Sequence, residues 1–140
     1  MIKGYCQAVR HSTLTAAFVG SNPTSPVGKR KVNAMTVNVL GTIYTIRESN
    51  KVDNPNLDGV DGYCDSSTKT IVIDTFKDSP GSLEDLDAYR RQVIRHELVH
   101  AFLFESGLDA CSWARNEEIV DWMAIQFPKL LKVFKEIDLI

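Results

Sequence analysis

The amino-acid sequence predicts an α+β fold, in which a small antiparallel sheet of about four strands is followed by three helices. Two observations support this class. β-Branched residues and turn formers alternate between residues 36 and 74, which is typical of short strands joined by tight connections. Beyond residue 82, apolar residues recur at three- and four-residue steps, the spacing of a helix face. Because the strands precede the helices, an alternating parallel arrangement is disfavoured.

The length and composition indicate one domain. The chain has 140 residues and 44% hydrophobic content, enough for a real core. Residues 1–34 lack periodicity and are rich in turn formers, so we expect a poorly ordered N-terminal extension and a domain over residues 35–140. The net charge of −2 disfavours nucleic-acid binding, and no apolar run is long enough to cross a bilayer. The odd number of scattered cysteines argues against a disulfide framework, and we expect a cytoplasmic protein.

The predicted strands follow in order. β-Branched residues on both sides of Leu40-Gly41 predict a hairpin, and residues 48–62 are rich in Asn, Asp, Pro and Gly, which predicts a loop. Residues 62–65 and 68–74 predict two further strands around a turn at Ser66-Ser67.

Three helices are predicted after the strands. Ser82 to Asp85 resembles a capping box that opens the first helix, and Gly107 is a natural residue just beyond its end. A second helix is expected from about residue 114 to 127, because Pro128 should halt it. A last amphipathic helix follows, with Leu130, Leu131, Val133, Phe134 and Ile137 as its apolar positions.

The first predicted helix contains the motif His96-Glu97-Leu98-Val99-His100. Residues four apart lie on one helix face, so the two imidazoles can bind one metal ion. Glu97 points toward the same cavity and can take a proton from an activated water. The alternative is a helix face that carries two buried, hydrogen-bonded histidines without a metal.

The second predicted helix can complete such a site. Glu117 and Asp121 share one face and lie a short loop after the motif. Glu117 can provide the third ligand, and Asp121 can accept the outer N–H of a ligand histidine. Glu118 stays open as the alternative ligand. The other interpretation is that these acidic residues bind no metal and only interact favourably with the helix dipole in the first turn.

His-Glu-x-x-His followed by Asn-Glu-x-x-x-Asp resembles the thermolysin-like zinc peptidases, the gluzincin group. The short chain is also similar to the small peptidases of the ImmA/IrrE type, and residues 35–137 resemble short metallopeptidase-like proteins of phages and Gram-positive bacteria. The resemblance implies a minimal zincin-like fold and one zinc ion bound by His96, His100 and Glu117. It also implies that Glu97 is the general base, that Asp121 accepts a hydrogen bond from a ligand histidine without touching the metal, and that the substrate is a peptide or protein.

Further expectations concern the reaction. Tyr63, Tyr44 and Arg115 are candidates for stabilising an oxyanion, and the sequence does not choose between them, while Tyr63 is also a candidate for contacting substrate. We expect the strand Thr70–Asp74 to border the cleft and to pair with extended substrate. The alternatives are a zinc-stabilised binding module with little or no activity, and an interaction protein with a coincidental motif. A set of two histidines and one carboxylate can also bind iron, and the oligomeric state is left open.

Overall fold

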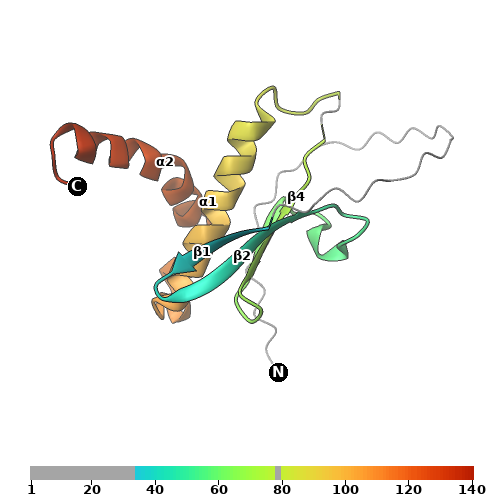
Figure 1. The fold of residues 1–140 in the computed structure, drawn as a ribbon, viewed down its shortest axis with the longest axis horizontal. Helices are drawn as coiled ribbons and strands as arrows, with labels where there is room; N and C mark the ends of the chain where they lie inside the picture. The colour runs from blue at the N-terminus through green and yellow to red at the C-terminus, as the bar shows by residue number, and fades with distance from the viewer. Residues whose placement is uncertain (1–33, 78–79) are drawn as a thin grey trace, which may run out of the picture.

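A computed structural model describes residues 34–77 and 80–140 of the protein. The predicted extension over residues 1–34 lies outside the described residues except for its last residue. The described chain is α+β, as predicted: a four-stranded sheet is followed by two α-helices and short 3₁₀ turns (Figure 1). The elements are β1 (Met35–Val39), β2 (Thr42–Ser49), β3 (Gly62–Asp65), β4 (Thr70–Asp74), α1 (Leu86–Glu105) and α2 (Glu117–Glu136).

The sheet is mixed, which corrects the prediction that all its strands are antiparallel. Its strand order is β1-β2-β4-β3: β1–β2 and β3–β4 are antiparallel pairs, and β2 and β4 run parallel. After β2 the chain crosses to the edge of the sheet and forms β3 there, and β4 then lies between β2 and β3. Ile71, Val72 and Ile73 of β4 are all fully buried, as expected for a central strand covered on both faces.

The predicted hairpin is confirmed, and the strands begin and end within two residues of the predicted bounds, since β4 starts at Thr70 and β2 extends to Ser49. Leu40 and Gly41 both adopt positive φ angles, +50° and +94°, and the Asn38 side chain accepts a hydrogen bond from the Gly41 N–H. Two successive positive φ angles are typical of the tight turns that match the twist of paired strands. The second antiparallel pair, β3 and β4, lies on either side of the predicted Ser66-Ser67 turn.

Helix α1 begins at Leu86, about one turn later than predicted, because Asp85 is its cap and accepts from the Ala88 N–H. Its predicted end is confirmed by Gly107, which adopts a φ of +76° just beyond it. The chain then turns through two 3₁₀ segments, Leu108–Ala110 and Ser112–Arg115, and returns along α1.

The predicted break at Pro128 is wrong, because α2 is one continuous helix from Glu117 to Glu136. Proline has no N–H for the carbonyl four residues earlier, which is that of Ala124. Arg95 of α1 donates to this carbonyl instead, with an Nε–O distance of 2.6 Å. The residues expected to form a separate last helix are therefore the second half of α2.

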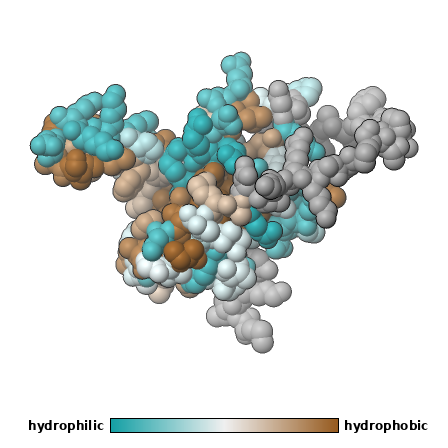
Figure 2. Space-filling model, in the orientation of Figure 1, coloured by the Kyte–Doolittle hydropathy of each residue, from teal (hydrophilic) through white to brown (hydrophobic). Residues whose placement is uncertain are grey.

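The core lies between one face of the sheet and α1. It contains apolar residues from all four strands and from α1: Val39, Tyr44, Ile46, Cys64, Ile71, Ile73, Val93 and Ala101. Val120 and Ala124 bury the first half of α2, and its second half projects away from the sheet (Figure 1) with large apolar side chains exposed on one side (Figure 2). Within the described ranges, no helix is long and apolar enough to span a bilayer.

Candidate metal centre

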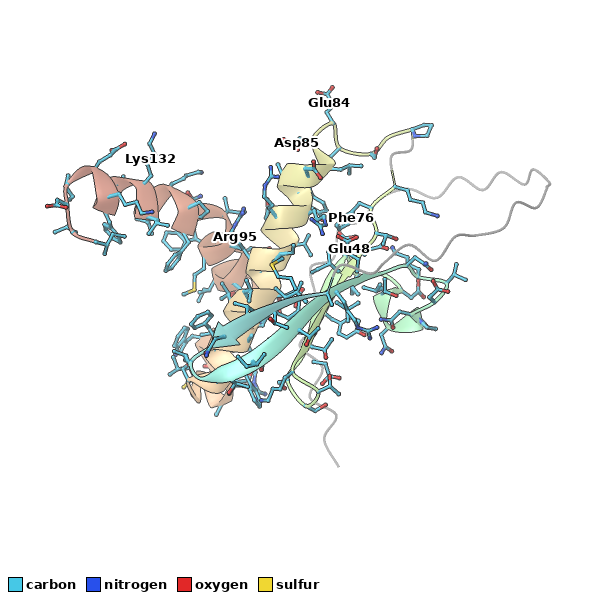
Figure 3. All side chains as sticks on the ribbon, in the orientation of Figure 1. Glu48, Phe76, Glu84, Asp85, Arg95 and Lys132 are labelled. Atoms are coloured by element: carbon cyan, nitrogen blue, oxygen red, sulfur yellow. The ribbon has the colours of Figure 1, made fainter. Side chains whose placement is uncertain are left out.

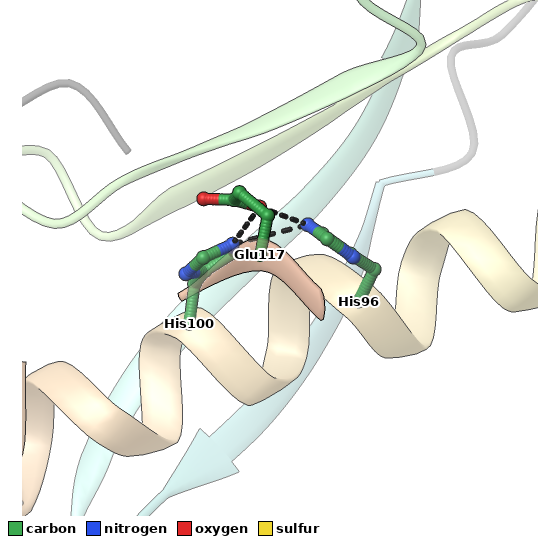
Figure 4. Close-up of side chains that lie close together, drawn as sticks. All are labelled: His96, His100 and Glu117. Carbon is green, nitrogen blue, oxygen red and sulfur yellow. Dashed lines mark hydrogen bonds and ion pairs between the residues drawn. The ribbon is translucent and has the colours of Figure 1, made fainter. Parts of the chain in front are cut away.

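The two motif histidines lie on the buried face of α1, one helical turn apart. His96 is 1% exposed and His100 is 4% exposed. Their Nε2 atoms are 3.0 Å apart, and both point into the same space (Figure 4). The spacing of four residues therefore brings the two nitrogen ligands together, as the sequence predicted.

Glu117, the first residue of α2, completes the cluster. Asn116 caps this helix by accepting from the Ile119 N–H, so the start of α2 is fixed directly beside α1. The Glu117 Oε2 atom lies 3.2 Å from His96 Nε2 and 3.3 Å from His100 Nε2 (Figure 4). The neighbouring Glu118 is exposed. The geometry therefore favours Glu117 of the two acidic candidates.

The three ligand atoms fit a small cation. Their separations are 3.0, 3.2 and 3.3 Å. Four-coordinate zinc has bonds of about 2.0–2.1 Å to nitrogen and oxygen, which places neighbouring ligand atoms about 3.3 Å apart. His96, His100 and Glu117 thus form a group that could hold a metal ion. A tetrahedral ion bound by these three residues would keep a fourth position for water or substrate.

Asp121 fixes the orientation of His96. Its Oδ1 atom accepts from His96 Nδ1 at 2.9 Å. With the proton on Nδ1, the Nε2 atom presents its lone pair to the cluster, which is the form that binds a metal. Asp121 stands one turn after Glu117 on α2, so one helix provides both carboxylates, and the structure contains the predicted contact between Asp121 and a motif histidine.

Hydrogen bonds hold Glu117 in its charged form. Partial burial raises the pKa of its carboxyl, but hydrogen bonds and charge from His100 and His96 lower it by more, to about 2. A bound divalent cation would supply positive charge at the same place, and it would require both imidazole Nε2 atoms to give up any proton they carry.

Glu97 lies beside the cluster and is 1% exposed. Burial raises the pKa of its carboxyl to about 7, although the nearby His96 and His100 favour the charged form. The Cys64 backbone N–H donates to this carboxylate. Its Oε2 atom has no hydrogen-bond partner among the described residues. A buried carboxyl with one unpaired oxygen and a pKa near neutrality has the properties of a general base.

The three candidate oxyanion donors are engaged elsewhere. The Tyr63 hydroxyl accepts from Asn54 at 2.8 Å. Tyr63 also alternates with Cys64, which faces α1, so its side chain lies on the opposite face of the sheet. The Tyr44 hydroxyl donates to Glu105 at 2.8 Å, and Arg115 Nε donates to the Asp109 carbonyl at 2.7 Å, so these contacts place none of the three donors in the cluster.

The prediction that Thr70–Asp74 offers a free edge to substrate is wrong, because β4 is paired on both sides, with β2 and with β3. The edge strand that reaches the cluster is β3. Asp74 N–H donates to the Asp61 carbonyl, and hydrogen-bonded pairs alternate along antiparallel strands. The backbone groups of Tyr63 therefore face β4, whereas those of Cys64 point away from the sheet, toward Glu97.

Two contributions to the site were not predicted. The Cys64 N–H is a backbone group, and only the strand register shows that it points toward Glu97. Arg95 precedes His96 and binds α2 at Ala124. Pro128 is the feature of the sequence that indicates the need for such a donor, because it leaves one carbonyl of α2 without a partner in its own helix.

Family models, curated proteins and solved structures were compared with this chain, and no match was found. The resemblance to gluzincin peptidases therefore rests on the motifs between residues 96 and 121, and the function must be argued from the site itself.

Proposed function

We propose that this chain is a zinc-dependent peptidase in which His96, His100 and Glu117 bind one zinc ion and Glu97 is the general base. One observation carries the proposal: three ligand atoms within 3.3 Å of one another lie next to a buried carboxyl that has an unpaired oxygen. A structural zinc site usually has four protein ligands, whereas three ligands and a neighbouring base are typical of hydrolytic sites.

In the proposed peptide hydrolysis, the metal ligands hold zinc and Glu97 transfers the proton. When bound, zinc acidifies water and polarises a carbonyl group. Glu97 accepts a proton from the attacking water while the water oxygen bonds to the carbonyl carbon of the scissile peptide. When the C–N bond breaks, Glu97 returns that proton to the leaving amine. The buried Oε2 atom of Glu97 supports this role, because it has no hydrogen-bond partner among the described residues and can accept the proton of a water beside it.

We further infer that an extended peptide substrate pairs with β3. This strand lies at the edge of the described sheet, and it runs past Glu97, which accepts from the Cys64 N–H. Pairing with an edge strand orders a peptide through main-chain hydrogen bonds. The inference replaces β4 with β3 as the substrate-binding strand.

The alternative is a zinc-stabilised binding module with weak activity or none. The positions of Tyr63, Tyr44 and Arg115 favour it, because each is bound away from the cluster. A peptidase would then need another donor for the oxyanion. The two functions share the metal site and differ only in turnover.

The first experiment measures zinc in the protein by elemental analysis and by competition with a chelating dye. We expect one zinc per chain, and we expect Glu117→Gln to lose most of the affinity because an amide is a much weaker ligand than a carboxylate. Glu118→Gln is the matched control, since the same change is made one residue away at an exposed position. Equal effects of the two substitutions would contradict the assignment of Glu117.

The second experiment separates the peptidase from the binding module. Glu97→Gln should retain zinc and lose hydrolysis of a peptide library by at least a hundredfold, because general-base catalysis contributes about 10²–10⁴ in rate. A wild-type protein that binds zinc but cleaves no peptide of the library would favour the binding module.

A further inference from the structure

The carbonyl of Ala124 is an acceptor that α2 itself cannot satisfy. In a regular helix this oxygen would accept the N–H of residue 128, but that residue is Pro128. Ala124 is 1% exposed and packs where α2 meets α1. A buried carbonyl without a donor strongly destabilises the helix that carries it, and helices commonly end or kink at such a proline.

Arg95 provides the missing donor from the neighbouring helix. Its Nε atom lies 2.6 Å from the Ala124 oxygen, and the side chain reaches across from α1 to α2 (Figure 3). Arg95 directly precedes His96, so the contact joins the turn of α1 that carries a metal ligand to the middle of α2. Glu117 and Asp121 lie within the two turns of α2 that precede the contact.

We propose that Arg95 is a positioning residue for the metal centre. Its N–H replaces the one that Pro128 lacks, and it thereby keeps α2 continuous and holds Glu117 and Asp121 against the two histidines. The proposal rests on the metal site of the proposed function and goes beyond it, because it assigns a role to a residue that touches neither metal nor substrate.

The geometry defines a matched pair of variants. The amide nitrogen of Gln occupies the same position along the side chain as the Nε atom of Arg, so Arg95→Gln keeps a donor there. Arg95→Met has a similar length and offers no donor. Pro128→Ala restores the backbone N–H and should make the donor at position 95 dispensable, and its side chain is exposed, so the change removes no core packing.

The test uses the full chain with Arg, Gln or Met at position 95, each with Pro or Ala at position 128. The midpoint of thermal unfolding is measured without metal, and zinc affinity is measured by competition with a chelating dye. With Pro128 present, Arg95→Met should lower the midpoint by about 4–8 °C and weaken zinc binding about tenfold. Arg95→Gln should show less than half of both losses. With Pro128→Ala, the losses caused by Arg95→Met should fall by more than half.

Equal losses with Pro128 and with Pro128→Ala would overturn the proposal, as would equal losses for the Met and Gln variants. If Arg95→Met alone does not fold, the double variant Arg95→Met with Pro128→Ala must fold, and its failure to fold would also overturn the proposal. A wild-type chain that binds no zinc would refute the proposed function and the role in metal positioning. The unfolding midpoints would still decide whether Arg95 replaces the Pro128 N–H.

Discussion

Gly62 allows α1 to lie close to β3, and Gly62→Ala should separate them. A Cβ atom at this position would lie 2.9 Å from Val93 Cγ1, 3.0 Å from Ile73 Cδ1 and 3.1 Å from the Val72 carbonyl oxygen. All three distances are shorter than normal van der Waals contacts. Val93 is on α1, one turn before His96 and Glu97, so a shift there would be transmitted directly to the site.

The expected loss of stability follows from these contacts. Adding a methyl group to a packed core costs about 1–3 kcal/mol in free energy of unfolding. Replacing Gly with Ala lowers the conformational entropy of the unfolded chain, which adds about 0.4–1 kcal/mol to the free energy of unfolding. A net loss of about 1–2 kcal/mol remains, which lowers the unfolding midpoint of a domain of this size by roughly 4–12 °C. The Cys64 N–H should also move away from Glu97 as β3 and α1 separate.

Thermal unfolding followed by circular dichroism measures this loss, and Val93→Ala is the compensating variant. Removing Val93 Cγ1 eliminates the closest of the three contacts, so Gly62→Ala should cost less than half as much when residue 93 is Ala. Some cost should remain, because the Val72 carbonyl belongs to the sheet and cannot move aside. A cost that does not depend on residue 93, or a Gly62→Ala variant more stable than wild type, would refute this account of the packing.

Three further predictions concern charge and metal. Glu105 accepts hydrogen bonds that lower its pKa, first among them that of Lys69, so Glu105→Gln should lower the unfolding midpoint at pH 7. Because the folded pKa is depressed, this stabilisation is present above the unfolded pKa of about 4.5 and is lost as pH falls through the folded value, so melting curves of the two proteins should converge in acid. Asp121→Asn should weaken zinc binding about tenfold in a dye competition, since the charge that supports His96 is removed, and unchanged affinity would contradict that role. Chelation should lower the wild-type unfolding midpoint, and added zinc should restore it, whereas Glu117→Gln should respond to neither.

The parts of the site that follow from local helix geometry could be predicted from the sequence. His96 and His100 are four residues apart on one helix, so their convergence requires no knowledge of the rest of the fold. Predicting that Glu117 and Asp121 lie beside these histidines required one further assumption, that a second helix returns along the first after a short loop. Their relative phase on α2 then determined which carboxylate contacts the imidazole Nε2 atoms and which contacts Nδ1.

The parts that depend on distant contacts were not predictable in the same way. The position of β4 between β2 and β3 depends on how a loop crosses the sheet, and the strands themselves carry little information on that path. Tyr63 was assigned to the site from its residue type, but strand alternation places its side chain on the other face of the sheet. Pro128 failed to end α2 because the compensating donor, Arg95, comes from another helix.

The buried face of α1 offers a further argument that the cluster serves a function. Val93, Ala101 and Leu103 make this face an ordinary apolar helix surface, yet His96, Glu97 and His100 are buried between them. Burying three ionisable groups opposes folding, and one Glu97 oxygen has no partner among the described residues. Apolar side chains at these positions would pack at lower cost. Buried polar groups that lower the stability of a fold are expected where those groups serve a function. A bound cation would offset most of this loss of stability, because it would coordinate both imidazoles and the Glu117 carboxylate at once.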